Sequence, residues 1–258
     1  MELQGKNIIL TGASSGIGYA LAEELAKENC NLALISRRKY ITDELSVKLK
    51  KYSGKIISVE CDVSSKSCVS SACDIINSEF ERIDAVILNS GTGSRTTIEN
   101  FNSSDAENVF GVNVMGIIYF IEKLLPGFIK RKEGMIIGVS SISDVRGFPG
   151  SGLYPSSKAA ATNFLESLRV ELRKYNVKVL TVRPGFVKTP MTDKNEFYMP
   201  FLMDVHKAAV IIIKGIKKEK KIIEFPFPTI LGSKLIKIMP VFLFDFLLSR
   251  ELPKKKIE

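Results

Sequence analysis

Short apolar runs rich in β-branched residues alternate with longer amphipathic segments along most of this 258-residue chain. Uniformly apolar runs of strand length are typical of parallel strands buried on both faces, and the segments between them have helical periodicity. The pattern predicts seven strands, at Asn7–Leu10, Asn31–Ile35, Lys55–Val59, Ala85–Leu88, Met135–Val139, Lys178–Val182 and Lys221–Glu224. It predicts helices at Ile17–Glu28, Ile41–Lys51, Ser67–Glu81, Ser104–Lys132, Pro155–Tyr175 and Val205–Lys217. The expected fold is α/β: one doubly wound domain, with helices on both faces of a parallel sheet and a ligand site at the carboxyl ends of the strands.

The turn after the first strand is rich in glycine. In "TGASSGIG" (11–18), three glycines follow a strand and lead into a helix. Such glycines let the backbone approach a pyrophosphate, and the N–H groups and dipole of the new helix attract the anion. The spacing is Gly-x3-Gly-x-Gly, and a tight turn that only packs the helix closely is the alternative. The context favours a dinucleotide site formed by Thr11, Gly12, Ser14, Ser15, Gly16, Ile17 and Gly18.

The ends of the second and third strands bear on which dinucleotide binds. An acidic residue after the second strand would bind the ribose 2′-hydroxyl of NAD, whereas a basic residue would accept the 2′-phosphate of NADP. Ser36 stands there instead of an acid, and Arg37 and Arg38 follow it with guanidinium groups suited to phosphate. These residues favour NADP(H) over NAD(H); a solvated basic helix start is the alternative. After the third strand, Asp62 is placed to accept from adenine's amino group, to cap the next helix, or both.

A tyrosine and a lysine stand four residues apart in "SGLYPSSKAA" (151–160). Pro155 suits the first turn of a helix, so Tyr154 and Lys158 would share one helical face. A cation in that place would stabilise the phenolate and lower a pKa that is otherwise about 10. The alternative is a surface helix that happens to carry both residues. The pair alone does not distinguish a catalytic site from such a helix.

Seven short motifs together resemble the short-chain dehydrogenase/reductase family, in its branch of about 250 residues. They are "TGASSGIG" (11–18), "CDV" (61–63), "NSG" (89–91), "NVMG" (113–116), "GVSSIS" (138–143), "YPSSK" (154–158) and "PGFVKT" (184–189). They span roughly three quarters of the chain in the order and spacing of the family. The resemblance implies a Rossmann-like NAD(P)-binding fold and an oxidoreductase.

The resemblance assigns four catalytic residues. Tyr154 would be the general acid/base at a carbonyl or alcohol oxygen, and Lys158 would lower its pKa and bind the nicotinamide ribose. Ser141 would hold the substrate oxygen, and Asn113 would anchor a water in a proton relay through Lys158. Such a set suits hydride transfer without a metal, because a proton must reach the oxygen as hydride reaches the carbon. No metal is expected.

The resemblance also implies further cofactor contacts. Asn89 and Gly91 would let the backbone pass close to the cofactor. Pro184 and Gly185 would lie beside the nicotinamide, and Thr189 would meet its carboxamide or a phosphate. The remaining residues of the expected cofactor set are Val63 and Val187.

Two features depart from the family pattern. The usual "NAG" after the fourth strand is "NSG" here, a change at Ser90 that leaves cofactor binding possible. The chain does not end in the short Gly-Gly-containing tail of the bacterial acyl-carrier-protein ketoreductases. This argues against an acyl-carrier substrate, although the basic surface could meet an acidic carrier.

The composition narrows the class of protein. A hydrophobic content of 45% is ample for one core, and the net charge of +9 raises the question of nucleic acid or anionic membrane. The basic residues cluster late, at 214–221 and 253–256, rather than along an aromatic binding face, so nucleic acid is not the expected partner. The four cysteines lack a Cys-x-x-Cys pattern, which favours reduced thiols of an intracellular protein. The single histidine, His206, has no evident catalytic partner.

Two late segments are expected to border the substrate. The family resemblance implies that residues 189–204 form a mobile lid over the substrate, and their three methionines and aromatic residues would make its inner face apolar and adaptable; ordinary filling of the core is the alternative. Residues 226–258 form a hydrophobic and basic tail, expected as two short helices separated by Pro240 and too broken to span a bilayer. This tail would close the pocket, pack on another subunit, or lie on an anionic membrane surface. The expected division is residues 1–225 as the NAD(P)-binding domain and 226–258 as the tail.

The leading hypothesis is an NADPH-dependent reductase of a ketone or aldehyde on a hydrophobic, lipid- or steroid-like molecule. The alternatives are an NAD-linked alcohol dehydrogenase and a non-catalytic nucleotide-sensing scaffold on the same fold. The family resemblance implies a homodimer or homotetramer, formed through the helices predicted at Ser104–Lys132 and Pro155–Tyr175. The expected location is the cytoplasm, with attachment to a membrane surface as one reading of the tail.

Overall fold

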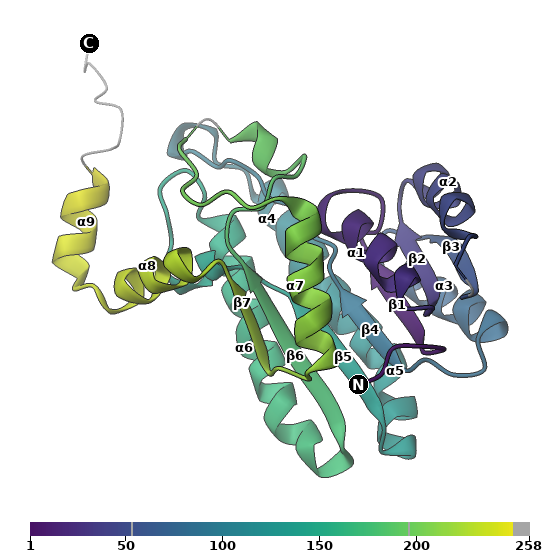
Figure 1. The fold of residues 1–258 in the computed structure, drawn as a ribbon. Coiled ribbons are helices and arrows are strands. Elements are labelled where there is room, and N and C mark those ends of the chain that lie inside the picture. Colours follow the sequence, from purple (N-terminus) through teal and green to yellow (C-terminus); the bar gives the residue numbers. More distant parts are fainter. Residues whose placement is uncertain (53, 196, 250–258) are drawn as a thin grey trace.

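A seven-stranded parallel sheet forms the centre of the computed structural model, which describes residues 1–52, 54–195 and 197–249 (Figure 1). Its strands are β1 (Asn7–Thr11), β2 (Asn31–Ser36), β3 (Ile56–Glu60), β4 (Ala85–Leu88), β5 (Gly134–Val139), β6 (Val177–Pro184) and β7 (Ile222–Phe225). In the described chain they pair in the order β3-β2-β1-β4-β5-β6-β7. The predicted fold is therefore confirmed, with strand ends displaced by at most two residues.

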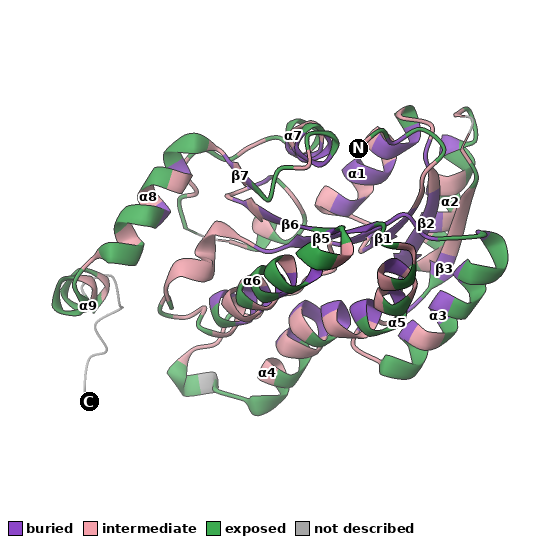
Figure 2. Ribbon diagram, turned by 90° about the horizontal axis from the view of Figure 1, so that it is seen from below, coloured by how far each residue is buried: buried purple, intermediate pink, exposed green. Residues whose placement is uncertain are grey.

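Two layers of helices cover the sheet (Figure 2). One layer holds α1 (Gly16–Lys27), α2 (Lys39–Leu49) and α7 (Val205–Lys217), which pack on a core that includes Ile8 and Leu10. The other layer holds α3 (Lys66–Glu79), α5 (Gly116–Arg131) and α6 (Leu153–Glu171), which pack on a core that includes Ile9. Successive residues of β1 thus face opposite layers, which explains why the strands read as uniformly apolar.

The predicted helix Ser104–Lys132 is continuous but not uniform. It consists of α4 (Ser103–Phe110), the π-helical turn η2 (Gly111–Met115) and α5. By length and composition, this stretch from Ser103 to Arg131 is the one helix in the described residues that could cross a membrane. Here it is a core helix instead, since Phe120 and Phe128 are fully buried. The hydrophobic pattern shows the helix but not the π turn, because one inserted residue barely disturbs the periodicity.

The C-terminal segment forms α8 (Phe227–Ile238) and α9 (Val241–Ser249). This confirms the prediction of two short helices on either side of Pro240. Residues 250–258, which include Lys254, Lys255 and Lys256, lie outside the described residues.

All four cysteines are free thiols. Burial raises the pKa of Cys30 and Cys61 to about 12 and that of Cys73 to about 11, whereas Cys68 is exposed on α3. Thiols with such high pKa values behave as small apolar side chains in the core.

Candidate active site

The carboxyl ends of β1, β4, β5 and β6 meet at one edge of the sheet, where most of the predicted site residues lie (Figure 1). The glycine turn follows β1 and leads into α1. Gly12 and Gly16 have φ angles of +69° and +54°, a region that side chains rarely adopt. A Cβ at Gly12 would lie 2.9 Å from the Asn89 amide nitrogen, and one at Gly18 would lie 2.1 Å from the Gly12 carbonyl. The backbone of this turn is thus not covered by side chains and lies at a helix N-terminus, an arrangement that suits a pyrophosphate. We call residues 11–18 the phosphate cradle.

Thr11 holds this cradle rather than lining it. Its side chain is buried, and its hydroxyl accepts hydrogen bonds from the backbone N–H groups of Asn89 (2.9 Å) and Ser90 (3.0 Å). The Asn89 amide donates in return to the Thr11 carbonyl at 3.0 Å. These bonds join the ends of β1 and β4. The Thr11 hydroxyl is therefore engaged by the protein itself, and Ile17 packs its side chain toward the core, so the predicted cofactor contacts of both residues stay predictions.

The two arginines after β2 point in different directions. The Arg38 guanidinium donates to the Ser14 hydroxyl (3.0 Å) and the Ser15 hydroxyl (2.9 Å), so it lies over the glycine turn. Ser36 is buried and donates to the same Ser14 hydroxyl at 2.7 Å. Arg37 lies 3.9 Å from a carboxylate oxygen of Asp62 and is two-thirds exposed. Arg38 is thus the arginine that lies over the glycine turn, and the binding of a 2′-phosphate by Arg37 and Arg38 stays a prediction.

Asp62 does not cap the helix that follows it. The N-cap of α3 is Ser65, whose hydroxyl accepts from the Cys68 N–H at 3.3 Å. Asp62 instead accepts from the Ser64 N–H (3.0 Å) and hydroxyl (2.7 Å). Burial works to raise the pKa of Asp62, but these bonds and the charge of Arg37 lower it overall. The adenine contact stays a prediction.

Val63 and Val187 have buried side chains, and their predicted cofactor contacts stay predictions. Val63 packs under the start of α5, where a Cβ at Gly116 would lie 3.0 Å from its Cγ2. Val187 forms a single parallel bridge with Met203, at the base of the segment predicted to be a lid.

Asn113 is fully buried in the π turn and fastens the loop after β4. Its Oδ1 accepts from the Thr92 N–H at 2.8 Å, and its Nδ2 donates to the Thr92 carbonyl and the Ser157 hydroxyl, both at 2.9 Å. Gly91 passes between this amide and Lys158, since a Cβ there would lie 3.3 Å from Lys158 Nζ and 3.5 Å from Asn113 Oδ1. The amide is therefore occupied by protein groups, and its direct role is to position the loop.

Lys158 is buried behind the tyrosine, one turn along α6. Its Nζ donates to the Val139 carbonyl at 2.9 Å and lies 5.8 Å from the centre of the Tyr154 ring. Burial lowers the pKa of Lys158 from 10.5 to about 8. A lysine with this pKa is still mostly protonated at pH 7 and can lose its proton in mildly alkaline solution.

Tyr154 meets Ser141 at the mouth of the site. Burial raises the pKa of the Tyr154 phenol, the hydrogen bond with the Ser141 side chain works against that rise, and Asp144 adds to it. The net direction is upward, so the predicted lowering of this pKa by Lys158 is not seen in this structure. The reason is that desolvation of the phenol outweighs the hydrogen bond with Ser141, and Lys158 is not among the groups that shift this pKa. The hydroxyl is therefore held in its protonated form at neutral pH.

The loop that carries Ser141 is fixed by a buried charge network that the sequence did not indicate. Ser141 begins the short 3-10 helix η3 (Ile142–Val145), where its hydroxyl accepts from the Ser143 N–H at 3.1 Å. The buried Asp144 carboxylate in η3 accepts from Arg183 Nε at 2.9 Å and from the Thr162 hydroxyl at 2.7 Å. Arg183, at the end of β6, also pairs with Glu224 in β7. The network therefore joins the catalytic loop to the last two strands.

The end of β6 completes the edge. The Gly185 N–H donates to the Phe225 carbonyl at 2.7 Å, directly after the buried Pro184. Thr189 packs its methyl against the glycine turn, because a Cβ at Gly16 would lie 3.1 Å from Thr189 Cγ2. The structure thus brings the predicted residues of four strand ends together around one edge of the sheet.

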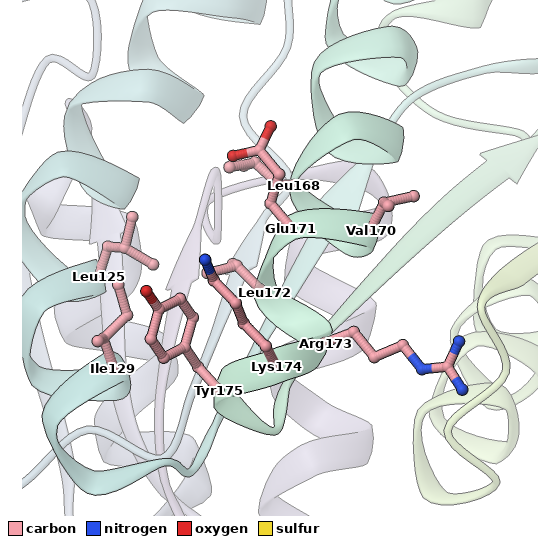
Figure 3. A pocket seen from close by; sticks show the side chains of 9 residues that line it. All are labelled: Leu125, Ile129, Leu168, Val170, Glu171, Leu172, Arg173, Lys174 and Tyr175. Carbon is pink, nitrogen blue, oxygen red and sulfur yellow. The ribbon is translucent and has the colours of Figure 1, made fainter.

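A hollow of about 780 Å³ lies between α5 and α6, away from this edge. Figure 3 shows the side chains that line it. Leu125, Leu168 and Tyr175 are among its lining residues, and none of the predicted catalytic residues lines it. It lies on the two helices expected to form the subunit interface. Within the described residues, no group of three or more His, Cys, Asp and Glu residues is arranged to hold a metal.

Comparison with known proteins places this geometry in a family. Residues 6–197 match the family profile described as short chain dehydrogenase. The chain belongs to the short-chain dehydrogenase family. It is an NAD(P)-dependent oxidoreductase, as the sequence resemblance implied.

Individual short-chain dehydrogenases resemble this chain over most of its length. An "uncharacterized oxidoreductase" of Myxococcus xanthus is 33% identical over 244 residues, which cover 95% of this chain and 96% of that protein. A fatty acyl-CoA reductase of Acinetobacter baylyi is 29% identical over 225 residues, which cover 86% of this chain and 76% of that protein. The crystal structure of a Burkholderia phymatum family member in complex with NAD has a TM-score of 0.83 at 24% identity and covers 100% of this chain and 99% of its own.

One further residue of this short-chain dehydrogenase escaped the sequence reasoning. A Cβ at Gly93 would lie 3.3 Å from Cδ2 of the Tyr154 ring, so any larger residue there would crowd the tyrosine where the loop crosses it. The stretch "SGTGS" (90–94) carries the signal, a second glycine two residues after the one in the motif.

Proposed function

We propose that this enzyme uses NADPH to reduce a ketone or aldehyde on a hydrophobic molecule, with Tyr154 as the proton donor. The observation that carries the proposal is the meeting of Tyr154 and Ser141 side chains beside the buried Lys158 ammonium. This places a protonated phenol and a second hydroxyl at one point on the edge of the sheet. A carbonyl oxygen at that point could accept hydrogen bonds from both.

The residues of the cradle fit a nicotinamide dinucleotide. The bare backbone of Gly12 and Gly16 would hold the pyrophosphate, and Gly91, beside Lys158, would let the loop after β4 pass close to the nicotinamide half. When bound in its reduced form, the cofactor supplies the hydride to the carbonyl carbon. Lys158, beside Gly91, is within reach of a ribose hydroxyl at that place.

The protein's own part in the reaction is the movement of one proton. As negative charge develops on the carbonyl oxygen, the Tyr154 O–H bond breaks and the proton forms the alcohol O–H bond. The resulting phenolate is stabilised by the Lys158 charge, and solvent returns the proton through Lys158. Ser141 orients the carbonyl and keeps its hydroxyl. The raised pKa of Tyr154 favours this direction, because a donor must be protonated when the substrate binds.

The preference for NADPH is supported by the end of β2. The hydroxyls of Ser14 and Ser15 lie under the Arg38 guanidinium, and Arg37 is exposed on the other side of Ser36. A 2′-phosphate between the two arginines would find charge-assisted donors, whereas a ribose hydroxyl of NADH would find no carboxylate at position 36.

A hydrophobic substrate is supported by the segment over the site. In residues 189–204, the exposed apolar side chains are Met191, Phe197, Tyr198, Phe201 and Leu202. Phe197 also packs edge-to-face on Phe186 after β6, with ring centres 5.9 Å apart. The resemblance to a fatty acyl-CoA reductase points to the same class of substrate.

The proposal is tested with a panel of ketones and aldehydes of increasing chain length, each assayed with NADPH and with NADH. The wild type should prefer NADPH and the more apolar carbonyls. Tyr154→Phe should retain NADPH binding, measured by nucleotide fluorescence, and lose about 10²–10⁴-fold in turnover because only the proton donor is removed. Turnover near that of the wild type in Tyr154→Phe would show that the proton comes from another group.

A further inference from the structure

The two C-terminal helices present many large apolar side chains to solvent. Figure 2 shows α8 and α9 extending away from the β7 edge of the body, with most of their length exposed. None of the described residues of α9 is buried. The large apolar side chains exposed on this surface are Phe227, Leu231, Leu235, Ile238, Val241, Phe242, Leu243, Phe246 and Leu247. We call these nine residues the tail surface.

The tail surface is held in a defined position beside the catalytic loop. Arg146, just after η3, donates to the carbonyls of Met239 and Lys237 between the two helices. Its guanidinium also lies 4.9 Å from the centre of the Phe244 ring, which meets Phe148 edge-to-face at 6.2 Å. The loop that makes these contacts runs from Ser141 to Tyr154. The outward direction of α9 is therefore set by contacts with the site and not by a loose chain end.

The tail is built to lie in an interface and not to cross a bilayer. At 1.5 Å per residue, the 12 residues of α8 and the 9 of α9 each fall short of the roughly 30 Å hydrocarbon core. On α8, the exposed apolar residues recur every three or four positions and form one stripe. Lys234 and Lys237 are exposed and lie along one edge of this stripe. An apolar stripe with lysines at its edge is the pattern of a helix at the boundary between lipid and water.

The charge of the chain favours a lipid surface over a second copy of the chain as the partner of the tail surface. Residues 226–258 contain six Lys and Arg against three Asp and Glu, and the whole chain carries a net charge of +9. Two copies docked through this surface would bring like charges together, whereas an anionic lipid surface would attract them. The lysines at 254–256 would add to that attraction, although they lie outside the described residues.

We infer that α8 and α9 dock the enzyme on an anionic lipid surface and hold the catalytic loop next to it. This inference rests on the proposed function. It also names the substrate class, a carbonyl lipid, and its source, the membrane in which that lipid is dissolved. The enzyme is then peripheral, with the tail surface in the headgroup region and the sheet in water. The contacts of Arg146 and Phe148 with the tail fix the distance between the lipid surface and Tyr154.

The inference is tested by sedimentation of the full chain with vesicles of phosphatidylcholine alone or with about 30% phosphatidylglycerol. Binding should need the anionic lipid and should fall as salt rises from about 0.05 to 0.5 M. Lys234→Gln with Lys237→Gln should weaken binding by about 25-fold, from about fivefold for each lysine near such a surface. Phe242→Ser with Phe246→Ser should weaken it by about tenfold or more, because both rings leave the interface. Ile75→Ser, at an exposed apolar position on α3, is the matched control and should bind as the wild type.

Two results would overturn the inference. One is equal or absent binding to both kinds of vesicle at low salt. The other is a change of oligomeric state in the Phe242→Ser, Phe246→Ser variant, since the tail surface would then be an interface between copies. Turnover of a water-soluble carbonyl, measured in parallel, should stay unchanged in all three variants. Vesicle binding without turnover of any carbonyl would refute the proposed function and leave the docking surface standing.

Discussion

Replacing Lys158 by Met should make the cofactor-free protein less sensitive to pH. Burial lowers the pKa of Lys158 from 10.5 to about 8, so the folded protein holds this proton less tightly than the unfolded chain does. Each tenfold loss of proton affinity corresponds to about 1.4 kcal/mol, so the buried charge costs about 3 kcal/mol of folding free energy below pH 8. The cost declines as pH rises from 8 to 10.5 and is absent above that range. A methionine carries no such cost.

The difference in unfolding free energy between the two proteins is therefore expected to change with pH. From pH 7 to 9.5 the cost in the wild type falls from about 3.4 to about 1.4 kcal/mol, so the wild type gains about 2 kcal/mol relative to Lys158→Met. The variant also leaves the Val139 carbonyl without its 2.9 Å donor, a penalty of about 1–3 kcal/mol that does not vary with pH. For this reason the slope, and not the absolute stability, is the diagnostic quantity.

The measurement is urea unfolding at several pH values without nucleotide. Lys50→Met, at an exposed lysine after α2, is the control: its unfolding free energy should change with pH in the same way as that of the wild type. If the unfolding free energies of Lys158→Met and the wild type differed by the same amount at every pH, Lys158 would not be desolvated, contrary to what the structure indicates. The same substitution should reduce both turnover and cofactor affinity, because the charge next to Tyr154 is lost.

Two further predictions concern the cofactor and the assembly. Ser36→Asp combined with Arg37→Gln should raise the KM for NADPH at least about tenfold, because a charged hydrogen bond contributes about 1.5–3 kcal/mol. The KM for NADH should change little. Equal losses for both cofactors would contradict the assignment of these residues. Sedimentation velocity at micromolar concentration should show a dimer or tetramer formed through α4, α5 and α6, and a monomer would count against the interface expected from the family.

The sequence predicted the fold well because each strand is buried on both faces and each helix has a clear periodicity. It predicted the site where a residue type is required by the backbone, as at Gly12, Gly16 and Gly18. It could not place side chains that could point either way. Arg37 and Arg38 are neighbours with the same chemistry, and only the packed turn shows that Arg38 lies over Ser14 and Ser15.

Long-range contacts were the other limit of sequence reasoning. Nothing in the spacing of Asp144, Arg183 and Glu224 shows that they form one buried network, since they lie in η3, β6 and β7. The sequence also does not show which apolar residues of the interface helices face outward. Phe120 and Leu168 are buried, whereas Phe110 and Phe164 are only partly so. Helical periodicity gives the angle between residues but not which side the sheet is on.

The contact between Gly185 and α8 has a consequence for how this chain can evolve. A Cβ at position 185 would lie 2.8 Å from Thr229 Oγ1 and 3.1 Å from Pro226 Cδ. The first turn of the tail therefore fills the space that any larger residue at 185 would need, although the family match ends at residue 197. Among descendants of this protein, positions 185, 226 and 229 should vary together or not at all, and a tail exchanged between lineages should bring its own residue 185 with it.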